Sequence, residues 1–211
     1  MSWEEIKIES LNVMFAGNGE NINSENLKDL ENQEEYGDYI RRMTGAINRC
    51  LSDIEVKRIL PLRRCSLDAE KGDSIGAYTV FDLAGIEDFF DVERVTYLRG
   101  DRYDGDLSYK REGSVIMIRN FEEEAQYNLL YRPSVRRLGA SADNTTEIDI
   151  PYSIACYIPY FVKGELFRED EPDEAGEARN WYEAAMAAFK SGERTDGRIS
   201  AVRSVYDLSE V

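Results

Sequence analysis

Residues 153–186 read SIACYIPYFVKGELFREDEPDEAGEARNWYEAAM and place two amphipathic stretches on either side of a dense acidic turn. Apolar residues recur at helical spacing from Ile154 to Leu166 and again from Ala178 to Phe189. Two such stretches joined by a short polar turn predict an antiparallel helical hairpin. The expected core of this hairpin consists of Ile158, Phe161, Trp181 and Tyr182.

Two prolines mark the beginning of the hairpin. Pro151 suits the first turn of a helix, because a residue at that position needs no backbone N–H donor. Pro159 lies inside the first apolar stripe, where it removes a helical hydrogen bond and crowds the preceding turn. We therefore expect one helix that starts near Pro151 and kinks at Pro159.

Helical periodicity also marks the first part of the chain. Ser2 and Glu5 have the spacing of a capping box, and apolar residues at helical intervals follow as far as Phe15. The clearest amphipathic helix covers residues 36–57, with apolar residues on one face of a charged segment, and Pro61 stops it. We expect the hairpin to pack on this helix.

The middle of the chain consists of short runs rich in β-branched and aromatic residues, separated by turn residues. The main runs are residues 75–83, 92–98, 114–118 and 125–132. In the last run Tyr127, Leu129 and Tyr131 share one face, whereas Asn128 and Arg132 belong to the other. This alternation is typical of a half-buried strand and predicts an antiparallel sheet covered on one side.

Helices, then strands, then helices predict an α+β fold: a helical bundle formed by the N- and C-terminal helices, with an inserted antiparallel β domain. Residues 1–58 and 150–192 are expected to form the bundle, and residues 59–149 the inserted domain. Residues 193–211 are expected to be a C-terminal tail. The tail from residue 195 is apolar without clear periodicity, and we expect it to order on a partner.

Charge argues against nucleic-acid reading. The chain carries 26 basic and 42 acidic residues, a net charge of −16, which repels phosphates over most of a surface. The charge is uneven, because residues 41–64 hold seven basic and two acidic residues. No run of about 18 apolar residues exists and the first residues are acidic, so we expect neither a membrane span nor export.

The reactive residue types point away from catalysis. The chain has no histidine, which excludes Ser–His and Cys–His catalysis and histidine-ligand metal sites within it. Its three cysteines are far apart and are expected to be reduced. The acidic cluster at 169–177 fits a solvated turn, a divalent-ion site or a partner for basic residues. We expect that the protein is not an enzyme and holds no cofactor or metal. A carboxylate-dependent hydrolase is the alternative, because 42 acidic residues always place some pair of carboxylates close together.

The order of several segments carries a resemblance. AINRCLSDIEVKRILPL, AYTVFDLAGIEDFFDVERVTYL, YKREGSVIMI and YNLLYRPSVRRL are followed by the closing segment that begins EIDIPYSIACYIPY and ends NWYEAAMAAF. This order resembles the head-to-tail connector, or adaptor, proteins of tailed bacteriophages, from residue 2 to residue 192. FDLAGIEDFFD replaces the proline-bearing strand end that is usual in that family.

The resemblance implies a structural virion protein of a tailed phage or prophage, assembled in the cytoplasm of the host bacterium. Such proteins form a ring of copies between the portal protein of the capsid and a tail-side neck protein, and DNA passes through as cargo. A chain of this kind can stay monomeric until a partner templates the ring. Another neck or tail-completion protein is the alternative.

A ring requires two different, complementary patches on each copy. The basic helix and the acidic turn can supply them, and charge reversal in the turn should then weaken assembly. The residues expected at the contact between subunits are Arg41, Arg42, Arg49, Arg58, Glu171, Asp173 and Glu174.

Overall fold

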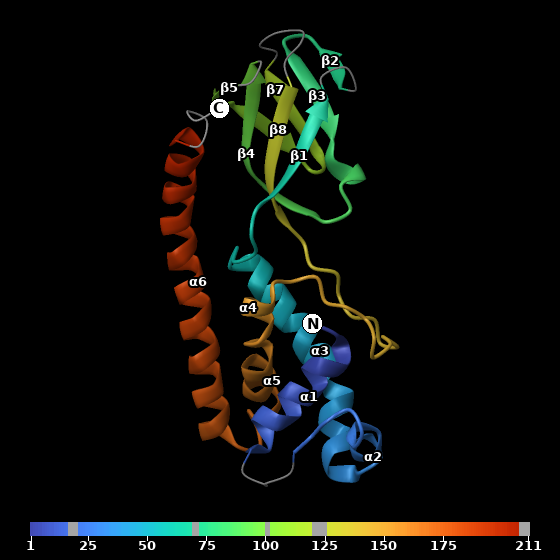
Figure 1. Cartoon of the computed structure of the whole chain (residues 1–211). Coiled ribbons are helices and arrows are strands. Elements are labelled where there is room, and N and C mark those ends of the chain that lie inside the picture. The colour runs from blue at the N-terminus through green and yellow to red at the C-terminus, as the bar shows by residue number, and fades with distance from the viewer. Residues whose placement is uncertain (17–20, 69–71, 100–101, 120–125, 207–211) are drawn as a thin grey trace. The chain divides into compact units, whose positions relative to one another are not determined.

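The computed structural model of the 211-residue chain describes residues 1–16, 21–68, 72–99, 102–119 and 126–206. The chain forms two compact units (Figure 1). Residues 1–59 and those from Val135 onward form a helical unit, and residues 60–134 form a β unit. Helices and two antiparallel sheets together confirm the predicted α+β class.

The helical unit begins with the capping box that the sequence predicts. The Ser2 hydroxyl accepts a hydrogen bond from the Glu5 amide, and the Glu5 carboxylate accepts one from the Ser2 amide. The long amphipathic helix is also confirmed. The helices of this unit are α1 (Trp3–Met14), α2 (Leu27–Glu31), α3 (Glu34–Val56), α4 (Tyr152–Ala155), α5 (Ile158–Leu166) and α6 (Pro172–Tyr206).

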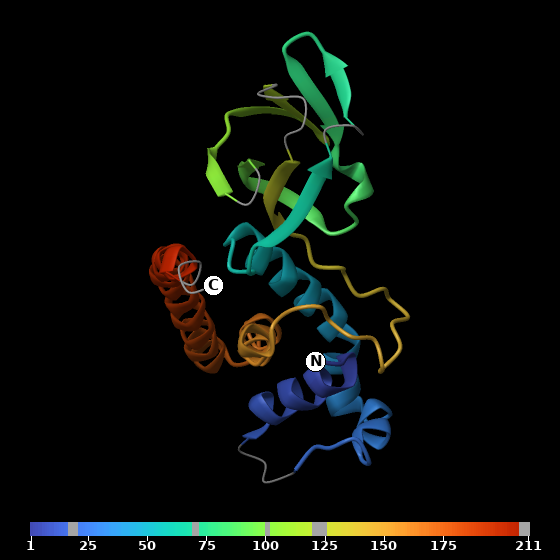
Figure 2. The same ribbon diagram turned by 45° about the horizontal axis from the view of Figure 1, so that its top comes forward.

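Helix α5 packs against α1, α3 and α6, and Figure 2 shows it between α1 and α6. Ile158, Phe161 and Val162 are buried on α5, and α3, which contacts α5, buries a stripe that includes Met43 and Ile47. Gly164 allows α6 to come close, because a Cβ there would lie 3.2 Å from the carbonyl oxygen of Ala175. The contact between α5 and α6 follows the hairpin that the sequence predicts.

The expected single kinked helix is wrong. The chain makes two separate helices, α4 and α5, and Pro159 lies in the first turn of α5. A residue in the first turn needs no N–H donor, so proline costs no helical hydrogen bond there. Ending α4 before Pro159 also avoids the clash of its ring with a preceding helical turn, which a kinked helix would keep. At the other end α6 runs as far as Tyr206, through most of the segment expected as a tail, while residues 207–211 lie outside the described residues.

A return segment, residues 135–138, leads the chain back from the β unit into the helical unit. Its backbone is held by two side chains of α3. The Asn48 amide bonds both the N–H and the carbonyl of Leu138, each at 2.9 Å. The carboxylate of Glu55 accepts from the Val135 N–H and from the Arg137 guanidinium. Residues 135–149 therefore belong to the helical unit, whereas the sequence-based division placed them with the strands.

The β unit contains two four-stranded antiparallel sheets, with strand orders β1-β8-β4-β5 and β2-β3-β7-β6. Its strands are β1 (Arg63–Asp68), β2 (Asp73–Ile75), β3 (Tyr78–Asp82), β4 (Phe89–Arg99), β5 (Arg102–Asp106), β6 (Tyr109–Glu112), β7 (Val115–Arg119) and β8 (Gln126–Pro133). The four runs predicted from the sequence correspond to β3, β4, β7 and β8. Between β3 and β4 the chain forms a short 3-10 helix, η3 (Leu83–Gly85), which the Asp82 side chain caps.

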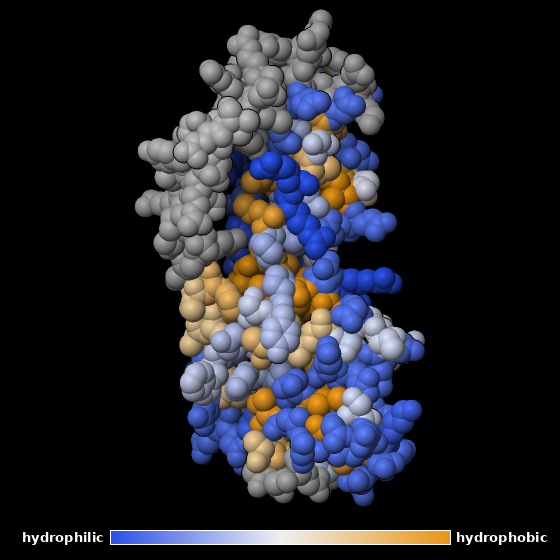
Figure 3. Space-filling model, viewed as in Figure 1, coloured by the Kyte–Doolittle hydropathy of each residue, from blue (hydrophilic) through white to orange (hydrophobic). Residues whose placement is uncertain are grey.

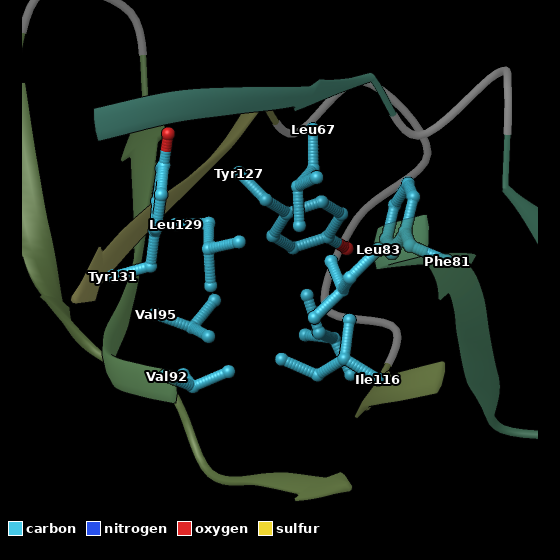
Figure 4. Packing of buried hydrophobic residues seen from close by; sticks show 10 residues of the cluster. Leu67, Phe81, Leu83, Val92, Val95, Ile116, Tyr127, Leu129 and Tyr131 are labelled. Carbon is cyan, nitrogen blue, oxygen red and sulfur yellow. The ribbon is translucent and has the colours of Figure 1, made fainter. Parts of the chain in front are cut away.

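Both sheets contribute to one hydrophobic core. Figure 4 shows Val95 and Leu129 from one sheet directed toward Leu83 and Ile116 on the opposite side. Tyr127 lies among them and packs edge-to-face with Phe81, with ring centroids 6.0 Å apart. The predicted face of β8 is therefore the one that meets the core.

The expected polar, solvent-facing side of β8 is wrong. Asn128 and Arg132 are only 4% and 9% exposed. Strand β8 lies between β1 and β4, so its backbone has neighbours on both edges. Arg132 donates to the carboxylate of Glu93 and to the backbone carbonyl of Leu60, which satisfies the buried guanidinium.

Hydrophilic residues cover most of the lower part of the view in Figure 3, where α1, α2 and α3 lie, with small apolar areas between them. Across the described residues, no helix combines the length and the apolar character that a membrane crossing requires.

Candidate functional site

The helical unit carries two hollows that share α5 as a wall. The first, which we call the aromatic hollow, has a volume of about 390 Å³ and lies between the end of α1, α5 and the start of α6. The second, the arginine hollow, has a volume of about 330 Å³ and lies between α3 and the end of α5. Their linings differ in chemistry and share no residue.

The aromatic hollow is lined by Tyr160, Trp181 and three charged residues. Lys163 is the centre of its polar contacts: its ammonium group lies 2.6 Å from the carboxylate of Glu174 and donates to the backbone carbonyl of Val13 at 3.2 Å. These bonds join the end of α1 to the start of α6 through α5. Glu177 adds a second carboxylate, which leaves the lining with one negative charge in excess.

The arginine hollow is lined by Arg42, Arg49, Arg168 and two glutamates. The Arg49 Nε donates to one carboxylate oxygen of Glu165 at 3.0 Å. The other oxygen of Glu165 accepts from Arg179, so this carboxylate is shared between two guanidinium groups. The lining therefore has one positive charge in excess, in a chain whose net charge is −16.

The basic residues predicted at a subunit contact all lie on the helical unit. Arg41 and Arg42 are exposed and share Asp38, each at 3.5 Å. Arg49 and Arg42 line the arginine hollow. Arg58 follows the last turn of α3 and its C-cap, Lys57, and has the left-handed conformation, with φ of 57°, at a position that usually favours glycine.

The acidic residues predicted at the contact lie around the start of α6. Glu171, Asp173 and Glu174 are exposed, and Glu174 belongs to the aromatic hollow. Within the described residues, no group of three potential ligand side chains has the geometry of a metal site. Pairing with basic residues was one interpretation of the acidic cluster. In the described part of the chain, Glu174 is the one of these three acids that makes such a pair.

The predicted core of the hairpin needs one correction. Ile158, Phe161 and Tyr182 are buried, but Trp181 is 60% exposed. Neighbouring positions of a helix point about 100° apart, so Trp181 and Tyr182 cannot both face α5. The buried residues Ala175, Ala178, Tyr182 and Met186 define the inner face of α6.

An ionic network holds α6 to α3. The Tyr182 hydroxyl donates to Asp53 at 2.8 Å, and the Lys57 ammonium group bonds both Asp53 and Glu183. Burial, together with the hydrogen bond to Asp53 and the charge of that carboxylate, raises the pKa of Tyr182 far above its ordinary value. Burial also raises the pKa of the Cys50 thiol to about 12. Both groups therefore stay protonated at neutral pH, as structural side chains do.

The sequence could have signalled the aromatic hollow in part. Glu177 and Trp181 are one helical turn apart, a spacing that places them on the same face of α6. Nothing in the sequence showed that Tyr160 and the end of α1 would face them. The chain matches no protein-family model and no curated protein.

Proposed function

We propose that the chain is a structural neck protein of a tailed phage or prophage, an adaptor that joins the capsid portal to the tail in a ring of copies. The observation that carries this proposal is the pairing of two unlike hollows on one helical unit. A copy that presents two different, oppositely charged surfaces can bind a neighbour through each of them, as a closed ring requires.

The finer architecture belongs to the same proposal. Helices α1, α3, α5 and α6 are taken as a bundle formed by the first and last parts of the chain, with residues 60–134 inserted as a β unit. This is the arrangement that the resemblance to connector proteins implies. The contacts of α5 with the three other helices support it.

The partners follow from the proposed place in the particle. The portal protein and a tail-side neck protein are expected above and below the ring, and the particle is assembled in the bacterial cytoplasm. DNA is cargo here, because the net charge of −16 disfavours tight binding of phosphates and leaves the duplex free to pass.

Deletion of the gene in the encoding phage or prophage tests this function. We expect negative-stain images of the lysate to contain heads and tails that are not joined, and a plasmid copy of the gene to restore tailed particles. Complete tailed particles in the deletion lysate would overturn the proposal.

A further inference from the structure

Helix α5 separates the two hollows. Tyr160 and Lys163 line the aromatic hollow, whereas Glu165 and Arg168 line the arginine hollow. Lys163 and Glu165 are two positions apart, which on an α-helix is a rotation of about 200°. The two hollows therefore open on different flanks of the helical unit, and one copy can use both at once.

The aromatic hollow has the chemistry of an arginine acceptor. The charge of Lys163 is matched by Glu174, which leaves Glu177 as the unmatched carboxylate of the lining. Glu177 is exposed and makes no ion pair within the described residues. Trp181 lies one turn further along α6 and is 60% exposed. An arginine can lie against an indole and bond a carboxylate at the same time, which a lysine does less well.

The arginine hollow has the complementary chemistry. Both oxygens of Glu165 are already bonded, by Arg49 and Arg179, so this carboxylate is not available to further cations. Arg168 is exposed, and no bond from its guanidinium to another described residue is present. This side chain is therefore the arginine of the hollow that is best placed to reach a neighbouring molecule.

We propose that the aromatic hollow of one copy binds Arg168 in the arginine hollow of a second copy, with the guanidinium between Trp181 and Glu177. The inference rests on the proposed function, because it specifies which surfaces join neighbouring copies in the ring. The two surfaces are different, so each contact leaves one free surface at either end and the contact repeats until the ring closes.

Two single charge reversals and their mixture test the pairing. Glu177→Arg gives a copy whose two surfaces are both basic, and Arg168→Glu gives a copy whose two surfaces are both acidic. Each variant alone should self-associate at least about tenfold more weakly than wild type in low salt, because like charges then meet at every contact. An equimolar mixture should regain association, since each surface of one variant complements a surface of the other.

Sedimentation velocity of the full-length proteins provides the readout, with Glu112→Arg as the matched control. Glu112 is exposed on β6, so the same change of charge there should leave association as in wild type. Where wild-type copies associate only on particles, the wild type, the two single variants, their mixture and the control are compared by the yield of tailed particles. The pairing is wrong if either single variant assembles like wild type. It is also wrong if the mixture stays dissociated.

The two proposals fail in different ways. If the gene deletion abolishes tail attachment and both single variants still attach tails, the proposed function stands and the pairing is wrong. If the deletion leaves tailed particles, the function itself is wrong, whatever the variants do.

Discussion

Replacing Glu55 by alanine tests what fixes the return segment to the helical unit. The Glu55 side chain is 8% exposed on α3 and accepts hydrogen bonds from the backbone of Val135 and from both terminal nitrogens of Arg137. These bonds join residues 80 and 82 positions apart. Alanine removes the acceptor and leaves a buried N–H without a partner.

The expected loss can be worked out from the two contacts. A buried N–H left unsatisfied costs about 1–3 kcal/mol. The guanidinium of Arg137 is 35% exposed, so water replaces part of its bond and the loss of the ion pair adds only about 1 kcal/mol. Glu55→Ala should therefore destabilise the helical unit by about 2–4 kcal/mol, the sum of the two contributions. Glu55→Gln keeps an acceptor for Val135 and should cost about 1 kcal/mol.

Urea unfolding followed by tryptophan fluorescence measures this loss selectively. The chain has two tryptophans, Trp3 and Trp181, and both belong to the helical unit. Asp38→Ala is the matched control on the same helix, since its pairs with arginine are exposed and 3.5 Å long. We expect that control to change stability by less than about 0.5 kcal/mol.

Two results would refute the reasoning. Unfolding of Glu55→Ala at the urea concentration of the Asp38→Ala control would show that the return segment does not depend on this carboxylate. Equal losses for alanine and glutamine would show that charge alone matters, and that the acceptor for the Val135 N–H contributes nothing.

Three further changes probe the packing of both units. Gly164→Ala should destabilise the helical unit by about 1–3 kcal/mol, because the new methyl group meets α6. Gly176→Ala has open space around it and should stabilise the unit by about 0.5–1 kcal/mol. Equal effects of the two substitutions in urea unfolding would contradict the close approach of α6 to Gly164. Burial and the hydrogen bond to Asp88 raise the pKa of Tyr131 to about 12. The stabilisation that protonated Tyr131 gives the β unit is therefore complete below about pH 10 and is lost as pH rises through about 12. In circular dichroism, the loss of folded protein with rising pH should be shallower for Tyr131→Phe than for wild type. Iodoacetamide at neutral pH should spare Cys50 and modify the two partly exposed cysteines, and equal rates would refute its burial.

The sequence predicts α1 and α3 well because their signals are local, whereas the short helix α2 was not predicted. The capping box of α1 lies within four consecutive residues, and the stripe of α3 repeats over six turns. Four of the strands, β3, β4, β7 and β8, are predicted for the same reason, and alternation within β8 identifies Tyr127, Leu129 and Tyr131 as the core face. The neighbours of a strand depend on distant parts of the chain. The alternation within β8 therefore does not predict that Asn128, on its opposite face, is buried.

The inner face of α6 shows how local patterns can leave two solutions. Trp181 and Tyr182 are adjacent aromatics, and the alanines around them fit a stripe centred on either. Hydrophobicity favours tryptophan, but the tyrosine hydroxyl has a partner on α3, Asp53, 129 positions away. The hydrogen bond of the hydroxyl group therefore decides which of the two aromatic residues is buried. Its acceptor on α3 is identified only when the packing of α3 against α6 is known.

The same argument explains why charge along the sequence overstated the basic surface. Residues 41–64 carry a net charge of +5, yet Arg49 and Lys57 are paired with Glu165 and Glu183, 116 and 126 positions away. Charges that are matched inside the unit contribute little to a partner, because their bonds would have to break first. What can act between copies is therefore the charge that folding leaves unmatched. Glu177 and Arg168 belong to this unmatched charge, and they line hollows on different sides of α5 that the sequence alone does not bring together.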